Sequence, residues 1–182
     1  MLIHTPNLRL LTCERAHLEA IVRDPQSLCE LLGASIPEGW PAYPQAYPHV
    51  LAQLKKQPLR PWSGWWLYLF THPEEKALVG CGGFKDAPDA QGRVEIGFEI
   101  ARAFHNRGLG AEAVSGLIGY AFTRPDVDAV EALALPKGDM RARAFEAAGM
   151  RAAGSCEAAV AGKVTQWRLT RAEFVKSRRK AA

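Results

Sequence analysis

The segment best suited to chemistry is a glycine-containing turn at residues 105–111, His-Asn-Arg-Gly-Leu-Gly-Ala. It follows a predicted strand and leads directly into a predicted amphipathic helix. Gly108 and Gly110 let the backbone turn sharply and leave its N–H groups free to face an anion. The start of the helix adds partial positive charge at the same point. The segment therefore predicts a phosphate or pyrophosphate site, with Arg107 as a side-chain supplement.

Other phosphate-binding motifs do not fit this turn. It lacks the spacing and the Lys-Ser/Thr pair of a P-loop. It also lacks the third glycine and the regular βαβ order of the dinucleotide-binding fingerprint. A purely structural role stays open, because Gly110 could simply allow close packing of the helix on the sheet.

The elements that must position this turn are predicted from hydrophobic periodicity and turn residues. Their order is several antiparallel strands, then strand–turn–helix, then strand–helix–strand, which favours a mixed α+β sheet. Three glycines at 80, 82 and 83 indicate that another group approaches the backbone of their strand. The Pro-rich stretch 35–63 is either a functional loop or an ordered connector. Strands are expected at 7–11, 65–70, 77–84, 93–100, 129–135, 152–159 and 163–169, and helices from a cap at Thr12 to about 22, at 27–32, at 50–54, from Gly108 to 122 and at 139–148.

The composition is that of an ordinary soluble globular protein, with 182 residues, 48% hydrophobic and 23% charged. A chain of this length can form a single domain, here residues 1–175, without a disulfide or a metal. The four cysteines show no C-x-x-C spacing and the five histidines no metal-ligand spacing, so we expect reduced thiols and no metal. Much of the net charge of +4 lies in residues 176–182, interpreted as a solvated, frayed basic tail and not as a nucleic-acid arm.

No signal-peptide pattern opens the chain, and no apolar run reaches the ~20 residues of a membrane span. We therefore expect a cytoplasmic protein that binds neither nucleic acid nor membrane.

From residue 78 to residue 150 the chain resembles the GNAT acetyltransferase superfamily, and most of all its RimJ/RimL-type branch. Each matching fragment is unspecific when taken alone, but four fragments in the family's order form a specific pattern. Residues 7–10 also fit the pattern of this branch. The resemblance implies an α+β GNAT-like fold: a mixed, mainly antiparallel sheet of six to seven strands, flanked by helices and splayed at its centre for acyl-CoA. The matching pieces are Leu78–Phe84, Val94–Ile100, Asn106–Ala113, and Leu135-Pro136 followed by a helix that ends in Glu146–Met150.

The same resemblance implies acetyl-CoA as co-substrate, with its pyrophosphate held by backbone amides. The pantetheine arm would lie between the strands 95–100 and 130–135, with the Ile100 backbone near the acyl carbonyl. His105 stands where relatives carry Gln or Arg, which is tolerable if the backbone does most of the binding. The expected cradle consists of His105, Asn106, Arg107, Gly108, Leu109, Gly110 and Ala111.

Chemistry in the resembling family is direct attack of an amine on the thioester, and the amine must first lose a proton. Glu95 and Glu99 lie on one face of their strand, with Gly97 between them. Both are therefore candidates for the general base, and solvent-facing strand residues are the alternative. Trp40 and Trp65 are candidates for the acceptor pocket, with packing roles as the alternative.

The chain departs from the pattern where relatives commonly carry Asn, Ser and Tyr, since these places hold Gly138, Arg141 and Phe145. A conventional general acid is therefore missing, although Arg141 could offer positive charge to the cofactor. The predicted function is N-acetyl transfer to a primary amine, either a protein or peptide N-terminus or a small molecule. A catalytically weak acyl-CoA-binding sensor or interaction module is the alternative, a nucleotide-binding regulatory domain a more distant one, and a homodimer is compatible with the sequence.

Overall fold

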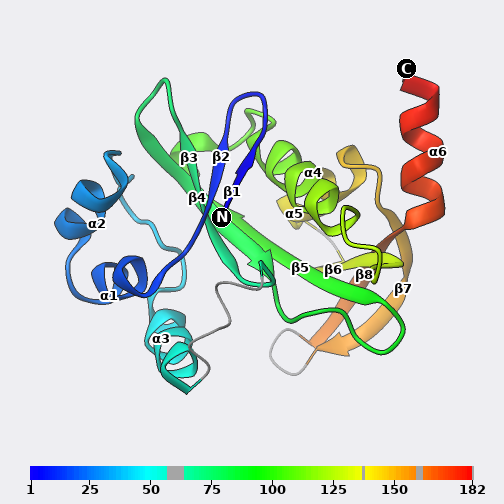
Figure 1. The fold of residues 1–182 in the computed structure, drawn as a ribbon, viewed down its shortest axis with the longest axis horizontal. Coiled ribbons are helices and arrows are strands. Elements are labelled where there is room, and N and C mark those ends of the chain that lie inside the picture. Colours follow the sequence, from blue (N-terminus) through cyan, green and yellow to red (C-terminus); the bar gives the residue numbers. More distant parts are fainter. Residues whose placement is uncertain (57–63, 137, 159–161, 182) are drawn as a thin grey trace.

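A computed structural model describes residues 1–56, 64–136, 138–158 and 162–181. Its centre is one eight-stranded sheet in the order β1-β2-β3-β4-β5-β6-β8-β7 (Figure 1). Only β5 and β6 pair in parallel, and the other neighbours are antiparallel. The strands are β1 (Leu2–His4), β2 (Arg9–Thr12), β3 (Leu67–His72), β4 (Ala77–Phe84), β5 (Arg93–Ile100), β6 (Ala129–Ala134), β7 (Arg151–Ala158) and β8 (Gly162–Thr170).

The mixed, mainly antiparallel sheet is thus confirmed, but six to seven strands was too few. The missed strand is β1, which has three residues and lies at the sheet edge beside β2. So short a segment has too little alternation to be recognised by periodicity. The predicted end of β7 at residue 159 lies outside the described residues.

Helices gather in two main groups around the sheet (Figure 1). The first holds α1 (Arg15–Arg23), α2 (Pro25–Leu32) and α3 (Tyr47–Lys56), with the 3₁₀ turn η1 (Pro44–Ala46) before α3. The second holds α4 (Leu109–Ala121), preceded by η3 (Arg102–Phe104), and α5 (Met140–Ala147), while α6 (Arg171–Ala181) follows β8. None of the described helices is long and apolar enough to cross a membrane.

Three helix predictions need correction or restriction. The N-cap of α1 is Glu14 and not Thr12, because Thr12 is still paired with Tyr68 in the sheet. Residues 176–181 continue α6 and are not a frayed tail. The Pro-rich stretch forms η1 and α3 up to residue 56, and its remainder, 57–63, lies outside the described residues together with residue 182.

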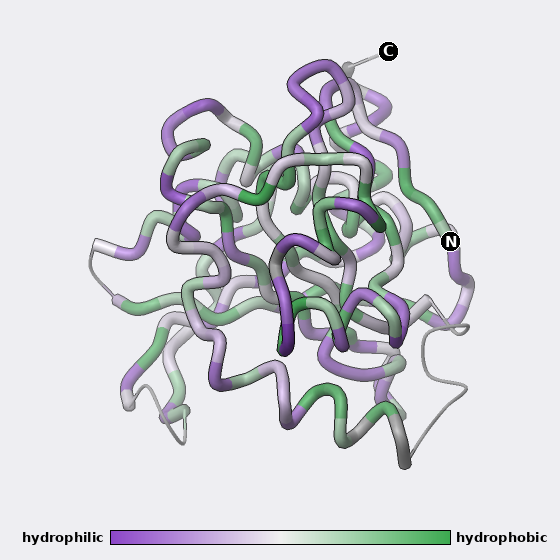
Figure 2. Tube along the Cα trace, turned by 90° about the vertical axis from the view of Figure 1, so that its left-hand side faces the viewer, coloured by the Kyte–Doolittle hydropathy of each residue, from purple (hydrophilic) through white to green (hydrophobic). Residues whose placement is uncertain are grey.

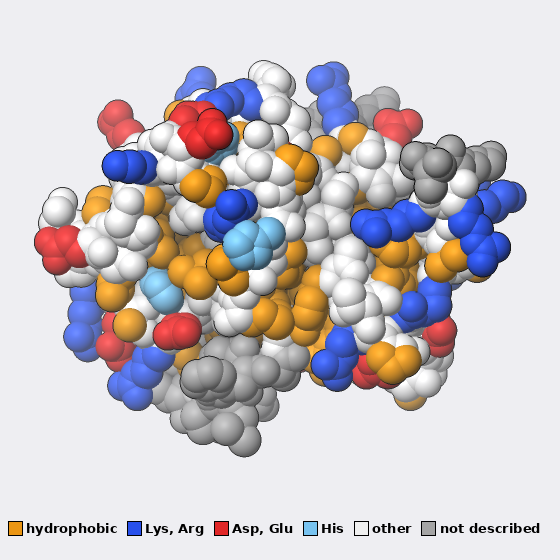
Figure 3. Space-filling view, turned by 45° about the horizontal axis from the view of Figure 1, so that its top comes forward, with side chains coloured by type: hydrophobic (Ala, Val, Ile, Leu, Met, Phe, Trp, Pro, Cys, Tyr) orange, Lys and Arg blue, Asp and Glu red, His pale blue; other side chains and the backbone are white. Residues whose placement is uncertain are grey.

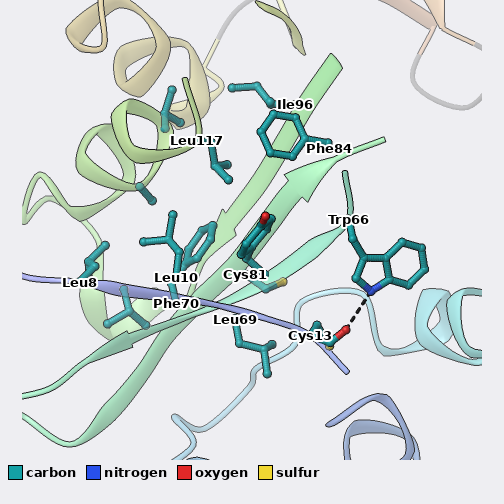
Figure 4. Close-up of a cluster of buried hydrophobic side chains, with 14 of the residues drawn as sticks. Leu8, Leu10, Cys13, Trp66, Leu69, Phe70, Cys81, Phe84, Ile96 and Leu117 are labelled. Carbon is teal, nitrogen blue, oxygen red and sulfur yellow. Dashed lines mark hydrogen bonds between the residues drawn. The ribbon is translucent and has the colours of Figure 1, made fainter. Parts of the chain in front are cut away.

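The sheet separates two sets of buried side chains. Phe70, Leu10 and Leu117 of α4 lie on one side, whereas Leu69 and the Cys13 region lie on the other (Figure 4). Along β5, Phe98 and Ile100 take the α4 side, because Gly110 of α4 would contact both with an added Cβ. The hydrophilic segments lie mainly on the outside of the trace (Figure 2). Each face of the sheet is therefore covered, and the two faces can hold different parts of a site.

The glycines of β4 allow the neighbouring backbone to approach closely. A Cβ at Gly80 would lie 2.1 Å from the Glu99 carbonyl oxygen, and one at Gly82 would lie 2.6 Å from the Gly97 oxygen. At Gly83 the added Cβ would instead meet the Trp66 carbonyl oxygen. The predicted close approach is confirmed, with β5 as the approaching group at Gly80 and Gly82 and the Trp66–Leu67 backbone at Gly83.

The parallel pairing of β5 with β6 stops halfway along β5. The last paired residues are Ile96 and Ala132, while β5 stays paired with β4 as far as Ile100. β6 continues on β8 to Ala134. The sheet is consequently splayed beside residues 97–100, as predicted.

Candidate active site

The turn between β5 and α4 presents an open helix N-terminus. Gly108, the N-cap, has a left-handed backbone with φ of 78°, and Asn106 has φ of 60°. No described side chain caps the helix. The first N–H groups of an α-helix lack intrahelical partners, here those of Leu109, Gly110 and Ala111. Together with the helix dipole they form a site suited to an anion.

His105 fixes the turn to the end of β5. Its Nε2 lies 2.8 Å from the Ile100 carbonyl oxygen, so the Nε2–H tautomer donates to that oxygen. The His105 side chain therefore faces β5. Its backbone N–H donates to the Arg102 carbonyl oxygen at 3.2 Å, so neither group of His105 is free for an anion in this conformation.

Arg107 already has an anionic partner. Its guanidinium forms an ion pair with Glu75, in the turn between β3 and β4, through Nη1 at 3.2 Å and through Nη2. Hydrogen bonding from Arg107 holds the pKa of the Glu75 carboxyl below its ordinary value. The guanidinium also lies over the Phe104 ring, 5.2 Å from its centroid. A phosphate would have to share or displace Glu75 to use this side chain.

Gly110 has a packing role as well. A Cβ there would lie 3.0 Å from Cε2 of Phe98, so the small residue lets α4 approach β5 closely. The alternative that Gly110 serves close packing of the helix on the sheet is therefore supported. At Gly108 an added Cβ would meet open space, so only the left-handed backbone favours glycine there.

Backbone groups of β5 face the gap left by β6. The Ala101 N–H donates to Val79 at 2.8 Å, and the Lys85 N–H donates to Glu95 at 2.9 Å. Odd-numbered residues of β5 therefore bond to β4, and by alternation the backbone groups of Phe98 and Ile100 point the other way. Such groups can pair with an extended ligand that takes the place of a strand.

A cavity of about 450 Å³ opens on the sheet face opposite α4. Its walls come from β4, β5, the η1–α3 segment, Trp66 and Leu67, and one residue of α5, Arg141. In the space-filling view, hydrophobic side chains surface in the middle of the face shown, with Lys and Arg around them (Figure 3). Glu95, Glu99 and Arg141 all line this cavity, so the fold brings these three predicted residues together.

Glu99 has the environment of a proton acceptor. Burial raises the pKa of its carboxyl, and hydrogen bonds from Cys81, the Ala42 backbone and Trp40 only partly oppose the shift. Its Oε1 accepts from Cys81 Sγ at 3.6 Å, and that sulfur lies 3.1 Å from the Tyr47 hydroxyl. A carboxylate with a raised pKa beside a cavity can take a proton from a bound ammonium group.

Glu95 differs from Glu99 although both lie on the same face of β5. Its carboxylate pairs with Lys85 at 3.4 Å and is 38% exposed. The structure therefore separates the two candidates that strand parity alone left equivalent.

Arg141 is held in place by the helix cap of α5. Asp139 accepts from its Nε at 3.0 Å and Nη2 at 2.6 Å, and also from the Leu135 N–H. Burial alone would raise the pKa of Asp139, but these hydrogen bonds lower it. The positive charge is thus fixed at the cavity wall.

Phe145 and Gly138, which stand where relatives of the family commonly carry Tyr and Asn, have structural roles here. Phe145 is buried against Phe98, with ring centroids 5.6 Å apart, beside the diverging end of β5. Gly138 has a left-handed φ of 72°, which favours glycine in the turn before α5.

Of the two tryptophans, one lies beside the cavity and one lies away from it. Trp40 is 9% exposed, and its Nε1 has no hydrogen bond of ordinary geometry among the described residues, but its N–H is near enough to lower the pKa of Glu99. Trp65 packs instead between Phe84 and Tyr120. Among the described residues, Trp66, Tyr43 and Tyr47 line the cavity in its place. The alternation of β3 with its flanking Trp-Trp pair could have favoured Trp66, but no local signal singles out the two tyrosines.

Comparison with known proteins identifies the family. The family model of the acetyltransferase (GNAT) domain matches residues 7–151, and the chain belongs to this family of acetyltransferases. It is 28% identical over 134 residues to the uncharacterized N-acetyltransferase YjdG of Bacillus subtilis, covering 72% of this chain and 79% of YjdG.

Solved structures share the fold. A RimL ribosomal L7/L12 α-N-protein acetyltransferase in complex with coenzyme A aligns with a TM-score of 0.69 and 14% identity, over 93% of this chain and 98% of that one. A chimera of spermidine N-acetyltransferase SpeG from Vibrio cholerae and hSSAT gives 0.69 and 13%, over the same shares. Proteins named for different acceptors thus share this fold equally well.

Proposed function

We propose that this protein transfers the acetyl group of acetyl-CoA to a primary amine, with Glu99 as general base. The observation that carries the proposal is the convergence, at the splayed end of β5, of an open helix N-terminus and a cavity lined by a half-buried carboxylate whose pKa is raised.

The residues present fit acetyl-CoA on the α4 side. The backbone of residues 105–111 would hold the pyrophosphate, and the backbone of Phe98 and Ile100 would hold the pantetheine arm in the gap. The uncapped N–H groups of α4 and the outward-facing groups of β5 support this assignment. When bound, acetyl-CoA supplies the thioester whose acyl group is transferred.

Glu99 would take a proton from the ammonium group of the acceptor, leaving a free amine. That amine would attack the thioester carbonyl, so that a C–N bond forms and the C–S bond breaks. The nitrogen would give up its second proton to solvent, and the leaving thiolate would take a proton from solvent. Arg141 would hold positive charge near the leaving group. A thiolate is a fair leaving group near neutral pH. The reaction therefore does not need a general acid at positions 138 and 145, where this chain has Gly138 and Phe145.

The motif pattern of residues 78–150 favours the RimJ/RimL-type branch. The same fold in a spermidine N-acetyltransferase leaves the acceptor to be decided by the cavity itself. We place the enzyme in the cytoplasm because its thiols lack disulfide partners among the described residues.

The test is calorimetric titration with acetyl-CoA, followed by measurement of thiol release with a panel of amines. Micromolar binding and amine-dependent thiol release are expected. Binding without release from any amine would favour the catalytically weak acyl-CoA-binding protein, and absence of binding would overturn the proposal altogether.

A further inference from the structure

The cavity beside Glu99 has a composition that selects among amines. The aromatic side chains of its described lining on this face are those of Tyr43, Tyr47 and Trp66, whereas the rings of Phe84 and Phe98 pack on the α4 side of the sheet. Such walls favour a flat apolar group through burial and ring contacts. At about 450 Å³ the cavity lies near the lower end of the ~300–1,000 Å³ range of small-molecule sites.

The charges at the cavity leave one carboxylate for an ammonium group. The charged residues among the described lining are Glu95, Glu99, Lys85 and Arg141. Glu95 is paired with Lys85, and Arg141 is held by Asp139. Among the ion pairs of the described residues Glu99 has no cationic partner, so it is the carboxylate free to bind an ammonium group. A second ammonium group would have to displace Lys85 from Glu95 or face the Arg141–Asp139 pair.

We infer that the acceptor is a small arylalkyl monoamine, whose ammonium group faces Glu99 while its aromatic body fills the chamber between α3 and β4. This inference rests on the proposed acetyl transfer and adds the substrate class. It separates the protein from a polyamine acetyltransferase, which would need a carboxylate for each further ammonium group.

Gly97 lets the cavity size be tested without disturbing the fold. It lies between Glu95 and Glu99 on β5 and lines the cavity, and an added Cβ would meet no described heavy atom within 4 Å. Its backbone is not in the left-handed region, so alanine or valine is compatible with the strand. Each methyl group added here occupies space otherwise open to the acceptor.

Gly119 of α4 is the matched control, because its added Cβ also meets open space but lies outside the cavity lining. Gly119→Ala should leave every acceptor's kcat/KM unchanged.

The experiment compares kcat/KM for 2-phenylethylamine, methylamine, spermidine and a short peptide with N-terminal Phe, in wild type, Gly97→Ala, Gly97→Val and Gly119→Ala. We expect 2-phenylethylamine to exceed spermidine and methylamine by at least about tenfold in wild type. Gly97→Val should remove about tenfold or more of that preference, Gly97→Ala less. Calorimetric titration of 2-phenylethylamine into the protein saturated with CoA gives a readout independent of turnover, and its binding should weaken in parallel.

The outcomes distinguish two failures. If thiol release proceeds but spermidine or the peptide is preferred, or if Gly97→Val leaves the preference unchanged, the acceptor assignment is wrong and acetyl transfer stands. If acetyl-CoA is not bound, or none of these or other amines releases thiol, the proposed function itself fails.

Discussion

The two halves of the proposed site, the anion site at the start of α4 and the acceptor cavity, use different chemical groups: backbone N–H groups in the first and side chains in the second. On the α4 side, the proposed anion site consists of backbone N–H groups at the start of one helix, those of Leu109, Gly110 and Ala111. On the opposite face, the cavity consists of side chains from β4, β5, α3 and α5 that are far apart in the sequence. A backbone site tolerates many side chains, whereas a side-chain site changes its ligand with each substitution. In this protein we therefore expect the acceptor half, and not the backbone half, to set the choice of substrate.

The largest expected effect separates the two carboxylates of the cavity. Glu99→Gln should lower kcat/KM for the acceptor by about 10²–10⁴-fold, because a general base is lost. The affinity for acetyl-CoA should not change, since Glu99 lies on the acceptor face. Steady-state kinetics with calorimetry of acetyl-CoA binding measure both quantities.

Glu95→Gln is the matched control, because it changes the same group on the same strand face. It should cost less than about tenfold, since its carboxylate is paired with Lys85. Equal losses in the two variants would mean that Glu99 is not the base.

The backbone half can be blocked by one charge at Gly108. Gly108→Asp should weaken acetyl-CoA binding by about tenfold to a hundredfold, because a carboxylate at the N-cap repels the pyrophosphate and occupies the open N–H groups. Gly108→Asn has the same shape without the charge, and both residues tolerate the left-handed backbone there. Calorimetry of the pair isolates the charge, and equal affinities would place the cofactor elsewhere.

The start of α4 is also tied to the N-terminal segment through Glu112. Its carboxylate accepts four hydrogen bonds, from the Thr5 hydroxyl, the Asn7 backbone and side chain, and the Leu8 backbone. Glu112→Gln should lower the free energy of unfolding by about 1–3 kcal/mol at pH 7, measured by urea denaturation. Glu30→Gln, on the exposed surface of α2, is the control.

The pH dependence of this effect has a definite sign. Burial alone would raise the pKa of Glu112, but the hydrogen bonds from Thr5, Asn7 and Leu8 outweigh it and the pKa is lowered. The stabilisation is therefore complete above the unfolded pKa of about 4.3 and is lost as the pH falls through the lower folded value. A difference between wild type and Glu112→Gln that persists to the lowest pH at which the protein stays folded would contradict this assignment.

The smallest effect should be a change in the pH profile of the acceptor half. The Cys81 thiol donates to Glu99 and thereby lowers the pKa of that carboxyl. Cys81→Ala removes the donor, so the acidic limb of kcat/KM against pH should move to higher pH. Cys81→Ser keeps a donor and should move it less. An unmoved limb in Cys81→Ala would show that another group titrates.

Much of the fold was predictable because its signals are local. The alternation in β3 to β6, the glycine turn at Gly108 and the Gly149 end of α5 are each written within ten residues or fewer. Two wrong predictions concern weak or misleading local signals. β1 has only three residues. Thr12 is a residue type that favours an N-cap, but here it pairs with Tyr68 in the sheet. Tertiary pairing overrode local preference at both places.

The sequence by itself determined the family motifs, the glycine turn before α4 and the face shared by Glu95 and Glu99, because strand parity and turn chemistry follow from residue types in order; the use of that turn as a phosphate cradle stays a prediction. Only the tertiary structure decided that the pKa of Glu99 is raised while Glu95 pairs with Lys85, that Trp66 and not Trp65 lines the cavity, and that Tyr47 reaches Cys81. These features depend on how α3 packs on the sheet, and burial and charge pairing between distant segments have no local pattern in the chain.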